Sequence, residues 1–189
     1  MTVLILITAV SLILFCGVKT AKPLNTAIKT VPALACAVYA FSHGDSTLIA
    51  AGLCVCALAD AVLNYVFVPG TVLFGLAHLC FMAGFISRGG HWTLRAIVFI
   101  LLASLLVYTV LNAGNRKKQP LMLVYVLLLS LMTALACGCG ASLMLGGILF
   151  TVSDTVLGMR ILYGWRPRYA GWLCMGTYYA ALVFMALGA

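Results

Sequence analysis

Long apolar runs, separated by short polar or glycine-containing connections, recur from one end of the chain to the other. They cover roughly residues 2–18, 23–41, 46–67, 71–87, 93–111, 119–138, 141–161 and 169–188. Most have about the 20 residues that an α-helix needs to cross the hydrocarbon core of a bilayer. Lipid cannot satisfy backbone N–H and C=O groups, so the runs are expected to be helical. The pattern predicts an all-α membrane protein, a polytopic bundle of eight transmembrane helices that forms one domain over residues 1–189.

The connections between the apolar runs are very short. Examples are "SHGDS" (42–46), "VPGT" (68–71) and "CGCGA" (137–141). They leave room for turns and for little else. Any chemistry is therefore expected inside the bundle. The first run lacks the basic flank and cleavage pattern of a signal peptide, and we expect it to be retained.

The composition agrees with a membrane protein, because 65% of the residues are hydrophobic and 7% are charged. The net charge of +8 reflects topology rather than nucleic-acid binding. With eight spans, one face receives only Arg88 and Arg95, and the other receives Lys19, Lys22, Arg116, Lys117, Lys118, Arg160, Arg166 and Arg168. The positive-inside rule then predicts a multi-pass protein of the cell (inner) membrane, with cytoplasmic basic loops that contact anionic membrane lipids and both termini extracytoplasmic.

Eight cysteines raise the question of a metal site. The segments "CVC" (54–56) and "CGC" (137–139) lack the two-residue spacing and the histidine partners of a zinc site. This favours cysteines as small packing residues. We expect neither a metal nor a cofactor.

Acidic residues are rare and unusually placed. The chain has no Glu and three Asp, of which Asp60 and Asp154 lie inside apolar runs. A carboxylate in the middle of a membrane helix costs about 2.5–3.5 kcal/mol on insertion scales and must face a partner or a wet cavity. The pair therefore points to function. A simpler alternative for Asp60, an ion pair with Lys29, stays open.

The two aspartates occupy similar positions in the two halves of the chain. "ADAVL" (59–63) and "SDTVL" (153–157) follow "KPL" (22–24) and "QPL" (119–121) at similar spacing, which suggests two parallel four-helix repeats. Each aspartate lies about seven residues before the basic end of its run, roughly 10 Å deep at 1.5 Å per residue. Other polar side chains near this layer are Lys22, Asn25, Lys29, Asn64, His78, Tyr125, Tyr178 and Tyr179. Taken singly, an Asn, His or Tyr in a membrane helix is more often an interhelical hydrogen-bond partner than a catalyst.

Two carboxyl groups that share a cavity of low dielectric constant cannot both ionise cheaply, so the pair holds a proton and supplies an acid and a base. This suits acid-catalysed cleavage of an ether-like C–O bond through an oxocarbenium-like state. It also suits a proton-coupled small-molecule carrier, in which protonation neutralises the site. A non-catalytic lipid-binding bundle is a third interpretation. The residues alone do not choose among them.

Several stretches along almost the whole chain form a recognisable series. They are "KPL" (22–24), "ADAVLN" (59–64), "FGLAHLCFMAGF" (74–85), "YVLLLSLM" (125–132), "GGILFTVSDTVLG" (146–158) and "MGTYYAALVF" (175–184). In these stretches the chain resembles the YhhN family of lysoplasmalogenase-like membrane proteins. The resemblance implies that the functional site contains Lys22, Asp60, His78, Ser153 and Asp154. It further implies that Asn64, Tyr125 and Tyr178 line this site.

The resemblance implies hydrolysis of the vinyl-ether bond at sn-1 of a lysoplasmalogen, a lysophospholipid, to a fatty aldehyde and a glycerophospho-base. As a mechanism we expect one aspartic acid to protonate the vinyl-ether carbon while the other activates water. Lys22 is expected to hold the substrate phosphate, and His78 to orient a carboxylate or a water. The carrier and the lipid-binding bundle remain the alternatives.

Overall fold

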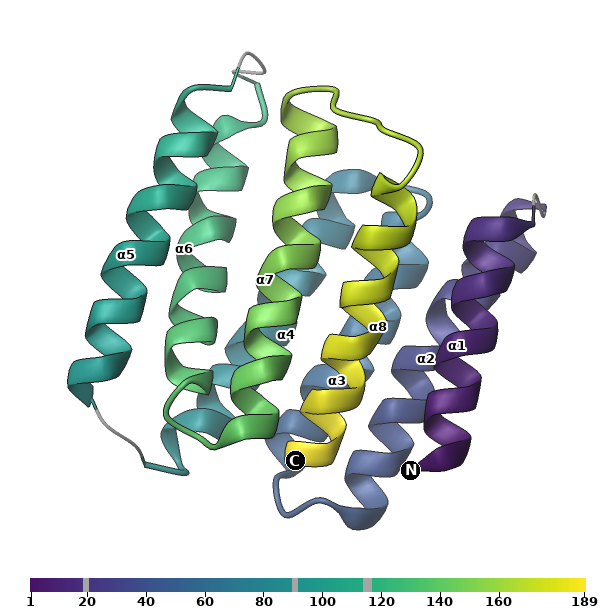
Figure 1. The fold of residues 1–189 in the computed structure, drawn as a ribbon, viewed down its shortest axis with the longest axis horizontal. Coiled ribbons are helices and arrows are strands. Elements are labelled where there is room, and N and C mark those ends of the chain that lie inside the picture. Colours follow the sequence, from purple (N-terminus) through teal and green to yellow (C-terminus); the bar gives the residue numbers. More distant parts are fainter. Residues whose placement is uncertain (19–20, 90–91, 114–116) are drawn as a thin grey trace.

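The structure of the protein is a computed structural model that describes residues 1–18, 21–89, 92–113 and 117–189. These residues form eight α-helices with short connections between them (Figure 1). In chain order the helices are α1 (Thr2–Gly17), α2 (Lys22–His43), α3 (Thr47–Leu63), α4 (Phe67–Ile86), α5 (Trp92–Leu111), α6 (Gln119–Ala136), α7 (Ala141–Leu162) and α8 (Ala170–Gly188). The predicted all-α bundle is confirmed.

Six of these helices are long and apolar enough to cross a membrane, and α1 and α3 are shorter apolar helices of 16 and 17 residues. Large apolar side chains cover the outside of the bundle, including Leu101, Leu105 and Tyr108 on α5. Such a surface is stable against lipid and not against water. The chain is therefore a multi-pass membrane protein.

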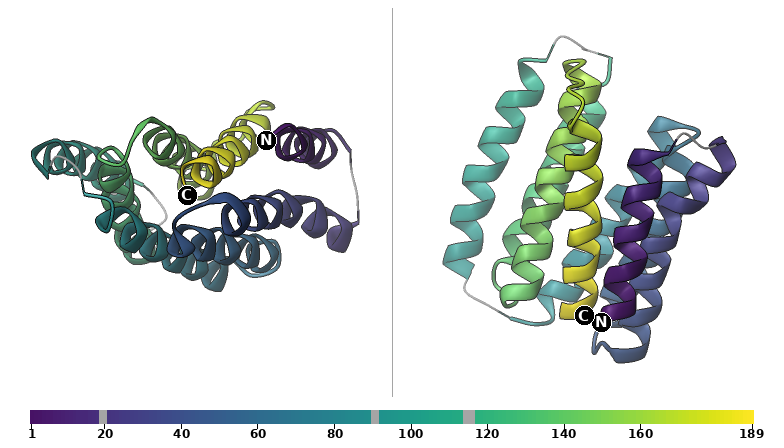
Figure 2. Two further views of the ribbon diagram at one scale, coloured as in Figure 1. Left: turned by 90° about the horizontal axis from the view of Figure 1, so that it is seen from below. Right: turned by 45° about the vertical axis from the view of Figure 1, so that its right-hand side comes forward.

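Seven of the helices close into a ring. Along the ring α1, α2, α3 and α4 pack in sequence, α4 packs on α6, and α7 and α8 lead back to α1. The view from below shows α7, α8 and α1 along one side and α2, α3 and α4 along the other (Figure 2). Helix α5 packs outside this ring, mainly on α6. The ring brings α3 and α7, the two helices that carry the buried aspartates, to the same interior.

One predicted boundary is wrong. The sequence "VPGT" (68–71) was expected to be the turn after the third span, whereas the turn lies at residues 64–66 and α4 already begins at Phe67. Pro69 fits the first turn of α4, because no intrahelical hydrogen bond needs its missing N–H there. Gly70 allows the first turn of α4 to pack directly against the end of α3, since a Cβ at this position would lie 2.5 Å from Leu63 Cα. As a result, Asp60 lies only three residues before the end of α3.

The ends of the bundle differ in charge. The helix ends and connections at the end opposite to the N and C labels in Figure 1 carry Lys22, Lys117, Lys118, Arg160, Arg166 and Arg168. Arg88 and Arg95 lie toward the end that carries those labels. Lys19 and Arg116, which we also assigned to the basic face, lie outside the described residues. The cytoplasmic assignment of the basic end stays a prediction, as does the pair of parallel repeats.

Small side chains allow the helices around the site to approach closely. Ala33, Ala37, Ala50 and Ala57 are buried between α2 and its neighbours, and Gly52 lies against the Phe81 ring. Close packing through small residues is the usual way in which membrane helices associate. Cys36 and Cys56 are also fully buried in this core, in agreement with the packing role expected for them.

Candidate active site

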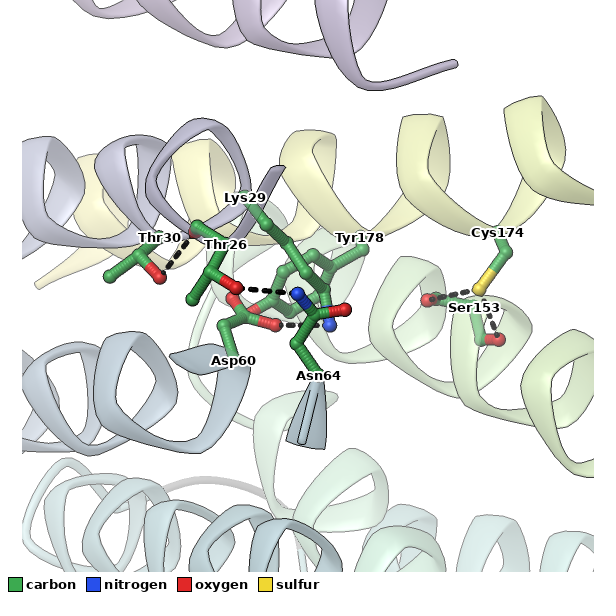
Figure 3. A network of polar contacts seen from close by, with 8 residues as sticks. All are labelled: Thr26, Lys29, Thr30, Asp60, Asn64, Ser153, Cys174 and Tyr178. Atoms are coloured by element: carbon green, nitrogen blue, oxygen red, sulfur yellow. Dashed lines mark hydrogen bonds and ion pairs between the residues drawn. The ribbon is translucent and has the colours of Figure 1, made fainter. Parts of the chain in front are cut away.

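Asp60 lies at the centre of a polar cluster built by three helices. Its side chain is 0% exposed. The Lys29 Nζ of α2 lies 2.9 Å from Asp60 Oδ1, and the Tyr178 hydroxyl of α8 donates a hydrogen bond of 2.6 Å to Oδ2 (Figure 3). The ion pair with Lys29 that the sequence left open is therefore formed. Both carboxylate oxygens have a partner from another helix, which fixes the position of the carboxylate.

Asp154 has a different partner. On α6, the Tyr125 hydroxyl donates a hydrogen bond to Asp154 Oδ2. Within the described residues the only ion pair is that of Lys29 with Asp60, so Asp154 has a phenol but no cation at contact distance. The adjacent Ser153 turns toward α8, where its Oγ lies 3.7 Å from Cys174 Sγ (Figure 3).

The two carboxyl groups line the same cavity inside the ring. It has a volume of about 120 Å³. The lining residues come from α1, α2, α3, α4, α7 and α8 and are Phe15, Lys29, Asp60, Leu63, Phe74, Ser153, Asp154, Leu157, Arg160, Cys174, Met175 and Tyr178. We call this space the polar cavity. The structure thus places Asp60, Asp154, Ser153 and Tyr178 at one cavity, and their part in a functional site stays a prediction.

A second cavity of about 60 Å³ lies beside the first, among α3, α4, α5, α6 and α7. Apart from Tyr125, Asp154, Tyr163 and three threonines, its lining is apolar, and we call it the apolar cavity. Leu63, Phe74, Asp154 and Leu157 line both cavities. Asp154 therefore stands at the boundary between a polar and an apolar compartment.

His78 lies one layer behind this site. Its side chain is 0% exposed, and its ring packs edge to face on Tyr125 and Phe150 with ring centroids 5.4 and 5.1 Å apart. Neither ring nitrogen has a hydrogen-bond partner among the described residues. His78 is absent from the linings of both cavities. His78 is connected to Asp154 through Tyr125, whose ring it contacts and whose hydroxyl donates the hydrogen bond to Asp154.

Lys22 and Asn64 lie at the basic end and do not line either cavity. Lys22 is exposed, and its Nζ lies 4.8 Å from the centroid of the Tyr65 ring. The Asn64 amide donates a hydrogen bond of 2.5 Å to Thr26 Oγ1 and one of 3.5 Å to the Lys22 carbonyl (Figure 3). Asn64 thus ties the end of α3 to the start of α2, instead of lining the site as the resemblance implied.

Arg160 is a lining residue that the sequence did not single out for the site, because it had been counted among the basic residues of the loops. A signal was present: Asp154, Leu157 and Arg160 follow one another at steps of three and all line the polar cavity. Residues three and four apart share a helix face. Phe74, which lines both cavities, gave no signal, since aromatic residues are common throughout the apolar runs.

Two carboxyl groups that line one cavity are chemically able to act as an acid and a base. Asp60 has a cation at contact distance that favours its negative charge by Coulomb attraction, and Asp154 has none there among the described residues. Two chemically identical groups in different surroundings can take different roles in proton transfer. The apolar compartment next to Asp154 is suited to a hydrocarbon chain.

Comparisons with known proteins identify relatives of the chain. A family model described as the YhhN family matches residues 24–189. The chain is 33% identical over 171 residues to the lysoplasmalogenase TMEM86B of Mus musculus, an alignment that covers 86% of this chain and 74% of that protein. No solved structure gives a significant match to the chain.

Proposed function

Since this chain belongs to the YhhN family, whose members are lysoplasmalogenase-like membrane proteins, we propose that it hydrolyses the vinyl-ether bond of lysoplasmalogens. The products are a fatty aldehyde and a glycerophospho-base. The observation that carries the proposal is that Asp60 and Asp154 line one partly enclosed cavity, next to an apolar cavity. Cleavage of a vinyl ether needs one proton and one water, and two carboxyl groups supply the acid and the base.

Asp154 is the proposed acid and Asp60 the proposed base. Asp154 donates its proton to the β-carbon of the vinyl ether, and the resulting oxocarbenium ion carries its positive charge on the ether oxygen and the α-carbon. Water then bonds to the α-carbon while Asp60 accepts its proton. The hemiacetal collapses, the C–O bond to glycerol breaks, and the hydroxyl proton of the hemiacetal passes to the leaving oxygen. A proton transfer from Asp60 to Asp154 restores the starting state.

The residues around the carboxyl groups position them. Lys29 and Tyr178 hold Asp60, and Tyr125 holds Asp154. His78 acts through the Tyr125 ring that it contacts, and is therefore a positioning residue. Ser153 contributes to the wall of the polar cavity, and Asn64 fixes the end of α3.

The substrate is proposed to lie across both cavities. The start of its alkenyl chain occupies the apolar cavity, and its glycerophospho part extends into the polar cavity, so that the vinyl ether comes to Asp154 at the boundary. The mechanism uses side chains and water, and it calls for no cofactor. Lys22, exposed at the basic end, meets the head group at the membrane surface before the substrate enters.

The test is aldehyde release by the purified protein in detergent. We expect aldehyde from a lysoplasmalogen and none from the matched 1-alkyl lysophospholipid, because a saturated ether has no double bond to protonate. In D₂O, trapped aldehyde should carry one deuterium on the carbon next to the carbonyl. Unlabelled aldehyde would contradict carbon protonation by the enzyme. Absence of aldehyde, together with solute uptake by vesicles that contain the protein, would instead favour the carrier.

A further inference from the structure

The polar cavity is lined by two cations that differ in their partners. Lys29 is already paired with Asp60 at 2.9 Å. Arg160, on the last turns of α7, lines the same cavity and forms no ion pair within the described part of the chain. A guanidinium group that faces a partly enclosed cavity without a counter-ion is suited to an anionic ligand.

The position of Arg160 along α7 fits a ligand that also reaches Asp154. Arg160 follows Asp154 by six residues, which is about 9 Å along the helix at 1.5 Å per residue. In a glycerophospholipid five covalent bonds separate the sn-1 ether oxygen from phosphorus, about 6 Å when extended. The side chains of Asp154 and Arg160 project into one cavity, so a vinyl ether at Asp154 places a phosphate within the reach of the guanidinium.

We propose that Arg160 binds the phosphate of the lysophospholipid substrate and thereby sets the position of the vinyl ether at Asp154. The inference rests on the proposed function for the identity of the substrate. A guanidinium binds a phosphate through two parallel N–H···O hydrogen bonds, which fix orientation as well as distance. Lys22, the residue expected from the sequence to hold the phosphate, is exposed, lies over the Tyr65 ring and does not line the cavity.

Binding of a ligand that cannot be cleaved tests the inference separately from the reaction. The probes are a 1-alkyl lysophospholipid and the matched 1-alkylglycerol, which lacks the phosphate; their affinities for the purified protein are measured in detergent. For Arg160→Gln we expect about tenfold or more weaker binding of the lysophospholipid and unchanged binding of the alkylglycerol. Arg160→Lys keeps the positive charge but lacks the planar guanidinium with its two parallel N–H donors. Its affinity for the lysophospholipid should lie between those of wild type and Arg160→Gln.

Arg168→Gln is the matched control, because Arg168 is exposed at the same basic end and does not line the cavity. It should bind both probes as wild type does. Equal loss of both probes in Arg160→Gln would mean a packing role and would overturn the inference. Unchanged lysophospholipid binding in Arg160→Gln, or a larger loss in Lys22→Ala, would overturn it as well. Selective loss without any aldehyde release would support the phosphate site and reject the proposed hydrolysis.

Discussion

At the scale of single residues, the two membrane-embedded aspartates differ in what surrounds them. Asp60 has a lysine and a tyrosine as direct partners, whereas Asp154 has a tyrosine alone among the described residues. Asp60 is fully buried in this pair and Lys29 is 12% exposed, so the pair is largely shielded from the surroundings of the bundle. Such a pair adds little stability compared with an apolar replacement of both partners, but the loss of one partner leaves an uncompensated charge.

Lys29→Met should therefore destabilise the protein, by about 3–5 kcal/mol, and lower the midpoint of thermal unfolding in detergent. The double variant Lys29→Met/Asp60→Asn removes both charges and should recover most of that stability. It should not recover aldehyde release, because the amide that replaces the carboxylate cannot accept a proton. A single variant as stable as wild type, or an active double variant, would contradict the roles given to this pair.

The sequence predicted several residues of the candidate site and misplaced others, because it gives the position of a residue along a helix better than the direction of its side chain. Counting residues along the helices put Asp60, Asp154, Tyr125 and Tyr178 near one layer, and in the structure Tyr178 contacts Asp60 and Tyr125 contacts Asp154. The count was wrong for Asp60, which lies three residues before the end of α3 instead of about seven. The direction of a side chain around its helix depends on which neighbours pack there. The sequence does not give this direction. His78 was expected to orient a carboxylate or a water, whereas in the structure its ring lies behind Tyr125.

At the scale of elements, α7 contributes most to the proposed site, with Asp154 between the two cavities and Arg160 toward the basic end. The sequence showed this helix clearly, because an aspartate interrupts a long apolar run. It did not show the start of α4. Pro69 and Gly70 are typical turn residues, and only the contact of Gly70 with Leu63 explains why they lie inside a helix.

Gly158 on α7 offers a test of the apolar cavity. It lines that cavity, and a Cβ added there meets no other atom within 4 Å. Gly158→Leu should fill the space with its side chain and improve helix propensity, so that the fold is preserved. We expect kcat/KM to fall about tenfold or more for long-chain lysoplasmalogens and to change less for short-chain ones.

The matched control is Gly171→Leu on α8, where an added Cβ also meets open space and the residue lines neither cavity. It should leave the chain-length preference unchanged. An equal loss for long and short chains in Gly158→Leu would show that the apolar cavity does not hold the chain.

At the scale of the whole molecule, the ring of seven helices with α5 outside was not predictable from the sequence. All eight runs are apolar on most faces, and the order of helices around a bundle depends on tertiary packing such as α4 on α6 and α8 on α1. The number of helices and their alternating direction were predictable, because both follow from run lengths and short connections. Charge then predicts orientation, with the basic end in the cytoplasm.

Labelling tests that orientation. Thr2→Cys and Lys117→Cys are introduced separately into a variant without native cysteines. Intact cells that contain each variant are then treated with a membrane-impermeant thiol reagent. We expect label on Thr2→Cys alone, and on Lys117→Cys only after the membrane is permeabilised. The reverse pattern would place the basic end, and with it the proposed phosphate site at Arg160, on the outer face.

The most direct test of the account is the turnover of Asp60→Asn and Asp154→Asn. Asparagine keeps the size of the side chain but can neither give nor take the proton, and general acid–base catalysis contributes typically about 10²–10⁴-fold. Aldehyde release from a lysoplasmalogen is measured over a range of substrate concentrations with purified wild type and both variants, each shown to be monodisperse by size exclusion. The account predicts that kcat falls at least about a hundredfold in each variant. Wild-type turnover by either folded variant would contradict the two-aspartate mechanism.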